Sequence, residues 1–160
     1  MDPEKDIFDK FYQASLHFLS FRPRSEREIR NFVKRKLHDG ESNPIEKIIS
    51  ELKKENLIND EEFVQWWVEQ TLEFNPKGLR ALKQELFAKG IDREVIENEL
   101  EKIKKPQLEA AAMKLLERKS GTKEKLISLL LARGFDWSFS KNLVDEYCQK
   151  RYNTSCCDNR

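Results

Sequence analysis

One seven-residue pattern occurs twice in this chain, as Leu86-Phe87-Ala88-Lys89-Gly90-Ile91-Asp92 and as Leu130-Leu131-Ala132-Arg133-Gly134-Phe135-Asp136. The two copies stand at a constant offset of 44 residues. In each copy a glycine follows an apolar stretch with a basic end, which is typical of a helix that ends in a residue of positive φ. The match predicts that one helical unit is repeated along the chain.

A third, weaker copy lies 53 residues before the copy that contains Gly90. At this offset Ile29 aligns with Leu82 and Val33 with Leu86. It departs at Leu37, which stands in the place of Gly90. Gly40 is expected to supply the break there. The three copies indicate one common plan of helix, short turn, helix, glycine-containing turn and helix.

Helix start signals surround these copies. Ser25-Glu26-Arg27-Glu28 fits a capping box, and Asn59-Asp60-Glu61-Glu62 offers the same arrangement. Asn43-Pro44 and Asn75-Pro76 each fit an N-cap followed by proline at the first helical position. Together with the apolar periodicity, these signals predict nine helices, over 6–20, 25–38, 44–56, 60–74, 76–89, 93–104, 106–118, 122–133 and 137–150.

The pattern favours an all-α fold, because no segment alternates with the period of a strand. We expect an elongated array of three tandem three-helix modules, each helix-turn-helix-like, that share apolar surface with their neighbours. The predicted modules are residues 1–58, 59–104 and 105–152, followed by a polar tail over 153–160.

Charge is balanced overall but segregated locally. The chain has 30 Lys and Arg against 29 Asp and Glu, a net charge of +1. From Arg22 to Lys36, however, seven basic residues face two acidic ones, and the next segment, 41–62, has seven acidic residues and three basic. We interpret this as a basic ridge that runs across the modules and binds a partner or DNA. Its predicted members are Arg22, Arg24, Arg27, Arg30, Lys34, Lys77, Arg80, Lys83, Lys89, Lys123 and Arg133. The alternative is that these charges solvate helix faces and pair with acidic residues of the same chain.

The sequence contains no recognisable catalytic machinery. Its two histidines, His17 and His38, fit ordinary helix positions, and no glycine-rich phosphate loop is present. The run Asp60 to Glu62 is better explained by the start of a helix than by a metal site. We therefore predict no catalytic residue, no cofactor and no metal.

Other residues are assigned to structural roles. The aromatic side chains of Trp66, Trp67, Trp137 and Phe139 are expected to pack in the core or between modules, although a binding hot spot is the alternative for the first pair. Cys148, Cys156 and Cys157 are expected to be reduced thiols. No stretch reaches the roughly 20 apolar residues of a membrane span. The charged N-terminus lacks the features of a signal peptide, so we expect the protein in the cytoplasm with no membrane partner. A monomer is the default expectation for its oligomeric state.

Three motifs resemble those of the RecX family of regulatory proteins. They are the opening stretch from Ala14 to Ile29, the segment Leu57-Ile58-Asn59-Asp60-Glu61-Glu62-Phe63, and the basic stretch that begins at Lys77-Gly78 and ends at Leu86 to Ile91. The resemblance covers about residues 10–150 and depends on the order and spacing of the three motifs. The chain departs from the family at Asn59, where an aspartate is more usual, and at Leu37, where a glycine is expected. Its tail from Asn153 has no recognised counterpart in the family.

This resemblance implies a modulator of the RecA recombinase. Such proteins bind the RecA–DNA filament along its groove and restrain its ATP hydrolysis, strand exchange and co-protease activity. Single- or double-stranded DNA is the other partner that the resemblance and the basic ridge suggest. Two alternatives stay open: a stand-alone DNA-binding helical repeat protein, and a helical scaffold for an unrelated partner.

Overall fold

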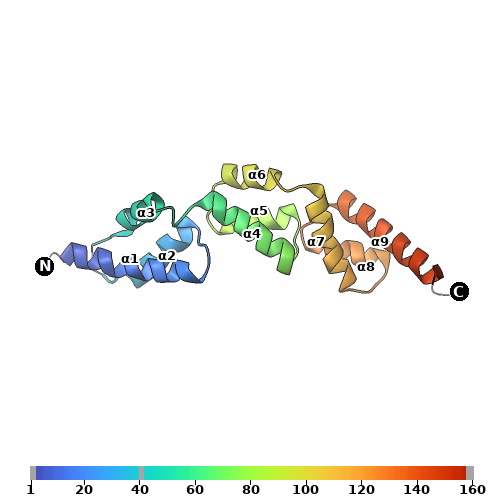
Figure 1. Ribbon diagram of the computed structural model, residues 1–160, viewed down its shortest axis with the longest axis horizontal. Coiled ribbons are helices and arrows are strands. Elements are labelled where there is room, and N and C mark those ends of the chain that lie inside the picture. Colours follow the sequence, from blue (N-terminus) through green and yellow to red (C-terminus); the bar gives the residue numbers. More distant parts are fainter. Residues whose placement is uncertain (1–2, 40–41, 158–160) are drawn as a thin grey trace. The chain divides into compact units, whose positions relative to one another are not determined.

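A computed structural model describes residues 3–39 and 42–157, and in these two ranges every regular element is an α-helix (Figure 1). Nine helices are found there, as predicted. Their bounds are α1 Pro3–Phe21, α2 Glu26–Lys36, α3 Ile45–Lys54, α4 Asp60–Phe74, α5 Leu79–Ala88, α6 Arg93–Glu101, α7 Lys105–Glu117, α8 Lys123–Ala132 and α9 Trp137–Cys157. The all-α fold class is thus confirmed.

The helix start at Ser25 has the predicted capping box, and the one at Asn59 has the predicted cap residue. The Ser25 hydroxyl accepts a hydrogen bond from the backbone N–H of Glu28, and the Glu28 carboxylate accepts one from the backbone N–H of Ser25. At the start of α4, the amide oxygen of Asn59 accepts from the N–H groups of Glu61 and Glu62, at 2.9 and 3.3 Å. These bonds satisfy amides that have no partner inside the helix.

Two predicted starts were misplaced. Helix α5 begins at Leu79 rather than Pro76, since the carbonyl of Gly78 is the first to accept, from the N–H of Leu82 at 3.1 Å. Helix α3 begins at Ile45, where the backbone N–H donates to the Asn43 amide oxygen at 3.0 Å. Pro44 is therefore the residue before this helix and not its first.

Two glycine turns have the predicted left-handed backbone. Gly90 has φ +79° and Gly134 has φ +86°. In each turn the following residue donates back to the carbonyl five residues earlier, Ile91 to Leu86 and Phe135 to Leu130, at 3.2 and 3.1 Å. This is the Schellman pattern of helix ends. Gly40, the expected third break, lies outside the described residues.

The C-terminal helix is longer than predicted. Helix α9 extends to Cys157, past the expected end near residue 150, because no glycine or proline interrupts the sequence from Trp137 onward. Part of the predicted tail is therefore helical.

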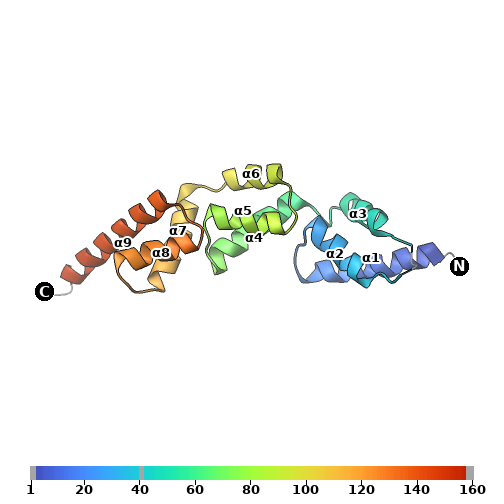
Figure 2. The ribbon, with the colours of Figure 1, turned by 180° about the vertical axis from the view of Figure 1, so that it is seen from behind.

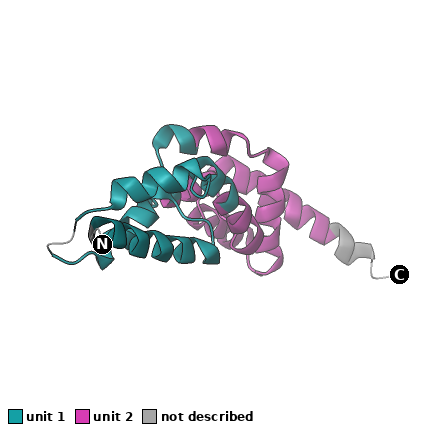
Figure 3. Cartoon of the chain, turned by 60° about the vertical axis from the view of Figure 1, so that its left-hand side comes forward, with its two compact units in different colours: residues 1–66, 86–96 teal, residues 67–85, 97–160 magenta. Residues whose placement is uncertain are grey.

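The chain divides into two compact units (Figure 3), Met1–Trp66 with Leu86–Ile96, and Trp67–Glu85 with Glu97–Arg160. The division falls inside α4, α5 and α6. The three modules with their predicted bounds thus stay a prediction.

In the first unit, α1, α2 and α3 pack side by side. The core contains Phe11 from α1, Ile29 and Val33 from α2, and Ile48 and Leu52 from α3, and none of these side chains is more than 1% exposed. Burial of such apolar groups is the main force that holds the three helices together.

The second unit has its own core. Helix α9 packs on α7 and α8, as Figure 2 also shows. The buried residues of this core include Leu116, Leu126, Leu130 and Val144. The Tyr147 hydroxyl donates to the carbonyl of Leu116 at 3.2 Å.

Each unit also contains a joint of the same design, in which a glycine turn rests on the start of a middle helix. In the first unit the Ser25 hydroxyl donates to the carbonyl of Lys89 at 2.8 Å, and Gly90 lies against the aliphatic carbons of Arg27. A side chain on Gly90 would overlap those carbons. The helix start is thereby held directly on the turn.

In the second unit the backbone N–H of Gly78 donates to the carbonyl of Arg133 at 2.9 Å, and Gly134 lies against Ala81. Ser25 and Gly78 are aligned residues, as are Lys89 and Arg133. The sequence repeat is therefore also a repeat of contacts.

Candidate binding surface

The outer face of α2 carries the densest group of predicted binding residues. Ile29 and Val33 are fully buried and fix the orientation of this helix. Arg27 and Lys34 consequently lie on the exposed side, as the helical period requires.

Six of the eleven predicted cations are ion-paired within the chain. The pairs are Arg22 with Glu28, Arg30 with Glu26 and Glu46, Lys77 with Glu85, Lys83 with Glu97, Lys89 with Glu28, and Lys123 with Asp145. A cation held this way presents little net charge to a partner and would have to break its pair to bind one. These six cations are therefore not part of the candidate surface.

Two further cations are used in the joint of the second unit. A guanidinium nitrogen of Arg80 donates to the carbonyl of Leu131 at 3.1 Å, and one of Arg133 donates to the amide oxygen of Asn75. Asn75 accepts this bond from a residue 58 positions away, and it does not cap α5, because that helix begins only at Leu79. Neither bond neutralises the positive charge.

The remaining predicted residues, Arg24, Arg27 and Lys34, have no carboxylate at ion-pair distance among the described residues, and neither do their neighbours Arg35 and Lys36. We call these five residues the α2 cationic surface. Arg35 and Lys36 were counted in the basic segment but were missing from the predicted site. The consecutive run of Lys34, Arg35 and Lys36 was the signal that could have included them.

Aromatic rings hold part of this surface in place. The guanidinium carbon of Arg24 lies 3.8 Å from the centre of the Phe18 ring, and the Lys36 ammonium lies 5.0 Å from that of Phe32. The two rings stack on each other at 4.3 Å. Burial, together with the nearby charge of Arg22, lowers the pKa of Arg24. Such cation–π contacts fix the direction in which a cation points without removing its charge.

Glu28 is the acidic residue beside this surface, but its charge is already in use. Its carboxylate pairs with Arg22 at 2.7 Å and with Lys89 at 3.0 Å. Burial acts to raise the pKa of Glu28, but hydrogen bonds from Arg22, Lys89 and the Ser25 backbone outweigh it and lower the pKa to about 2. The α2 cationic surface therefore keeps its positive charge.

A groove runs along this surface and gives it a shape that a ligand can enter. Its walls are Phe18, Arg24, Glu28, Asn31, Lys34 and Arg35. The ring of Phe18 lines this groove together with Arg24, Lys34 and Arg35. An aromatic ring beside unpaired cations is a common feature of binding surfaces for proteins and for nucleic acids.

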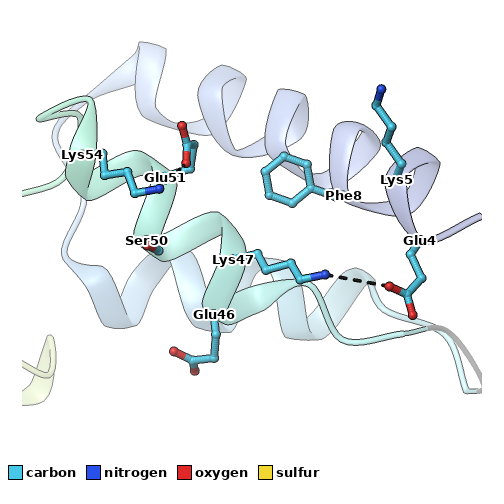
Figure 4. A pocket seen from close by; sticks show the side chains of 8 residues that line it. All are labelled: Glu4, Lys5, Phe8, Glu46, Lys47, Ser50, Glu51 and Lys54. Carbon is cyan, nitrogen blue, oxygen red and sulfur yellow. Dashed lines mark hydrogen bonds and ion pairs between the residues drawn. The ribbon is translucent and has the colours of Figure 1, made fainter. Parts of the chain in front are cut away.

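Another pocket of the first unit, between α1 and α3, is less suited to such a role (Figure 4). Its charges are mixed and partly paired, with Lys47 3.8 Å from Glu4 and Lys54 3.1 Å from Glu51. Phe8 contributes its main apolar surface. The pocket therefore lacks the uniform charge of the α2 surface.

The aromatic residues assigned to the core from the sequence differ in how far they are buried. Phe63 is buried, and Trp66 and Trp67 are half-buried, so that core packing accounts for much of their surface. Phe139 packs against the core of the second unit, as predicted. The prediction for Trp137 was wrong, because its ring is 57% exposed. As the first residue of α9, it lies ahead of the turns that bury Leu143 and Val144.

Neither metal binding nor membrane insertion is indicated by the described part of the chain. Among the side chains that the structure describes, over residues 4–39 and 42–152, no three His, Cys, Asp or Glu are grouped as they would be around a metal ion. In the same ranges, no helix combines the length and the apolar character that crossing a membrane demands. Asp60 instead accepts a hydrogen bond from the backbone N–H of Glu26, at 3.0 Å.

Comparison with known proteins gives a consistent result. Residues 59–100 match a family model described as the second three-helix domain of RecX. The chain is 34% identical over 148 residues to the regulatory protein RecX of Streptococcus agalactiae serotype III, and 33% identical over 142 residues to that of Oceanobacillus iheyensis. These matches cover 84% and 83% of this chain but 57% and 52% of the relatives, so the chain spans little more than half of their length.

Solved structures agree with the sequence relatives. The crystal structure of RecX from Lactobacillus salivarius superposes with a TM-score of 0.75 at 25% identity, covering 89% of this chain and 97% of that one. A second crystal structure, of a regulatory protein RecX, has a TM-score of 0.72 at 24% identity and supports the fold. It covers 89% of this chain and 73% of the other.

Proposed function

Since this chain belongs to the RecX family of regulatory proteins, we propose that it binds the RecA–DNA filament and restrains its ATP hydrolysis, strand exchange and co-protease activity. In this proposal the protein acts by binding alone and catalyses no reaction. It works as a monomer in the cytoplasm, where it needs neither a cofactor nor a membrane.

The observation that carries the proposal is the α2 cationic surface. A filament of protein and DNA presents phosphates and carboxylates, which attract a group of unpaired cations. Arg24 and Lys36 are already oriented by their aromatic neighbours, so binding requires less ordering of these flexible side chains. The groove between Arg24 and Lys34 gives an anionic group of the filament a place to enter.

The direct test is the ATPase activity of RecA on single-stranded DNA. Wild-type protein is expected to slow ATP hydrolysis in a concentration-dependent way. A double variant, Lys34→Glu with Arg35→Glu, should require about tenfold more protein for the same effect, since each removes one attractive charge and adds a repulsive one. Unchanged ATP hydrolysis at saturating wild-type protein would overturn the proposal.

A matched control is available in the second unit. Lys119 and Lys125 are exposed lysines, and Lys119→Glu with Lys125→Glu changes the net charge by the same amount. This control should inhibit RecA as wild type does. Equal loss in both double variants would mean that total charge, and not the α2 cationic surface, governs the effect.

A second candidate function is DNA binding without RecA, which the same unpaired cations favour because phosphates suit them as well as carboxylates do. Salt-titrated binding to single- and double-stranded DNA separates the two. Tight, sequence-specific duplex binding by the protein alone would favour the second function. Weak DNA binding alongside tight filament binding would favour the first.

A further inference from the structure

The second unit has an apolar groove next to its joint, separate from the α2 cationic surface. Its volume is about 510 Å³. Arg80 and Asp136 also line it, and its apolar walls are formed by Leu79, Leu108, Leu131, Phe135, Trp137 and Phe139. A space of this size accommodates one or two large side chains of a partner.

Two of these apolar side chains are exposed to water. Trp137 is 57% exposed and Leu79 is 41% exposed. Trp137 is not part of the buried cluster that holds α7, α8 and α9 together. A tryptophan that is dispensable for the core and lies at the edge of a groove has the character of a binding hot spot, because its burial by a partner removes a large apolar surface from water.

The walls of the groove are joined to one another by contacts within the second unit. Gly134 rests on Ala81, and the Arg80 guanidinium donates to the carbonyl of Leu131 at 3.1 Å. The rings of Phe135 and Phe139 stack with their centres 5.5 Å apart. A preformed groove binds more tightly than one that must first be ordered.

The charge at the rim is positive. Arg80 and Lys141 have no acidic partner among the described residues, and the Lys141 ammonium lies 5.2 Å from the centre of the Trp137 ring. The carboxylate of Asp136 accepts from the backbone N–H groups of Ser138 and Phe139 at the start of α9, so its oxygens are engaged by the helix start although its negative charge remains. Two cations against one carboxylate leave the rim with a net positive charge.

We propose that this groove binds a linear peptide segment of a partner protein in which one or two bulky apolar side chains are flanked by carboxylates. The apolar side chains pack against Trp137 and Leu79, and the carboxylates meet Arg80 and Lys141. The proposal does not depend on RecA as the partner of the chain, since the groove and the α2 cationic surface lie in different units.

The test is a selection of phage-displayed random peptides on the full chain, followed by binding of the selected, fluorescently labelled peptides in solution. Enriched peptides should combine an aromatic or large aliphatic residue with acidic neighbours. Trp137→Ala should weaken their binding about tenfold or more, as loss of a hot-spot tryptophan does. Arg80→Glu should weaken the binding of acidic peptides more than that of neutral ones.

The control is Tyr152→Ala, because Tyr152 is an even more exposed aromatic residue of the same helix, at 77%. It should bind the selected peptides as wild type does, and circular dichroism should show unchanged helicity for all three variants. The proposal is overturned if no acidic, apolar peptide is enriched, or if Trp137→Ala binds the selected peptides with wild-type affinity. Labelled oligothymidylate that binds wild type and is lost in Trp137→Ala would also overturn it, in favour of base stacking.

Discussion

Replacement of Gly134 by alanine is expected to destabilise the protein strongly, because two independent costs arise at this position. Gly134 has φ +86°, and an alanine in this left-handed conformation costs about 1–2 kcal/mol. In addition, the new Cβ atom would lie 2.6 Å from both the Cβ and the backbone nitrogen of Ala81. Overpacking of this kind typically costs about 1–3 kcal/mol.

The two costs together predict a loss of about 2–5 kcal/mol in the free energy of unfolding. For a chain of this length each kcal/mol lowers the melting temperature by about 2–4 °C. The melting temperature of Gly134→Ala should therefore fall by roughly 4–20 °C. Thermal unfolding followed by circular dichroism measures this directly.

Gly121→Ala is the matched control. A Cβ atom at Gly121 would meet only the side chain of Lys125, at 3.4 Å and beyond, and its φ is not in the left-handed region. This variant should unfold within a few degrees of wild type. Equal melting temperatures for Gly134→Ala and Gly121→Ala would show that the glycine turn does not lie in close contact with α5.

Three further variants test other contacts. Glu28→Gln should lower the free energy of unfolding at pH 7 by about 1–3 kcal/mol. Because the pKa of Glu28 is lowered from 4.5 to about 2, the wild type should lose this stabilisation as the pH falls from about 5 to 2. In urea unfolding across that range, the free energy of unfolding should therefore depend less steeply on pH in the variant than in the wild type. Tyr12 donates to Glu55 at 2.7 Å, and burial together with this bond raises its pKa to about 12, so an ultraviolet pH titration should find one phenol that ionises near that pH and is absent in Tyr12→Phe. Asn59→Ala removes the cap of α4 and should cost about 1 kcal/mol in chemical unfolding; an unchanged midpoint would show that the cap contributes nothing.

The fold was predictable because its local chemistry is explicit in the sequence. The capping residues Ser25 and Asn59, and the glycines at 90 and 134, act on backbone groups within a few residues. Such short-range signals do not depend on the rest of the structure. The helix order and most helix ends follow from them.

Long-range contacts limited the prediction elsewhere. Asn75 looked like a cap for the following helix, but its amide oxygen accepts from Arg133, far away in the sequence. Lys89 looked like a free cation, but it pairs with Glu28 across the joint of the first unit. Nothing in the sequence around either residue reveals its distant partner.

The candidate surface was therefore only partly predictable. The basic segment around α2 was found from charge alone, since the density of cations there exceeds the supply of nearby carboxylates. Which cations stay unpaired depends on the packing of α1, α2 and α3, and on the turn at Gly90. Around α2, the predicted residues without an ion pair among the described residues are Arg24, Arg27 and Lys34, and their neighbours Arg35 and Lys36 share this property. This group stays a proposal for the binding surface.

The central proposal is that the α2 cationic surface attaches this protein to the RecA filament. Co-sedimentation with RecA assembled on single-stranded DNA, measured over a series of salt concentrations, tests it most directly. Wild-type protein should sediment with the filament at low salt and be released as salt rises, and the Lys34→Glu, Arg35→Glu variant should be released at distinctly lower salt. Identical release curves for the two proteins, or wild-type binding that does not respond to salt, would contradict the claim.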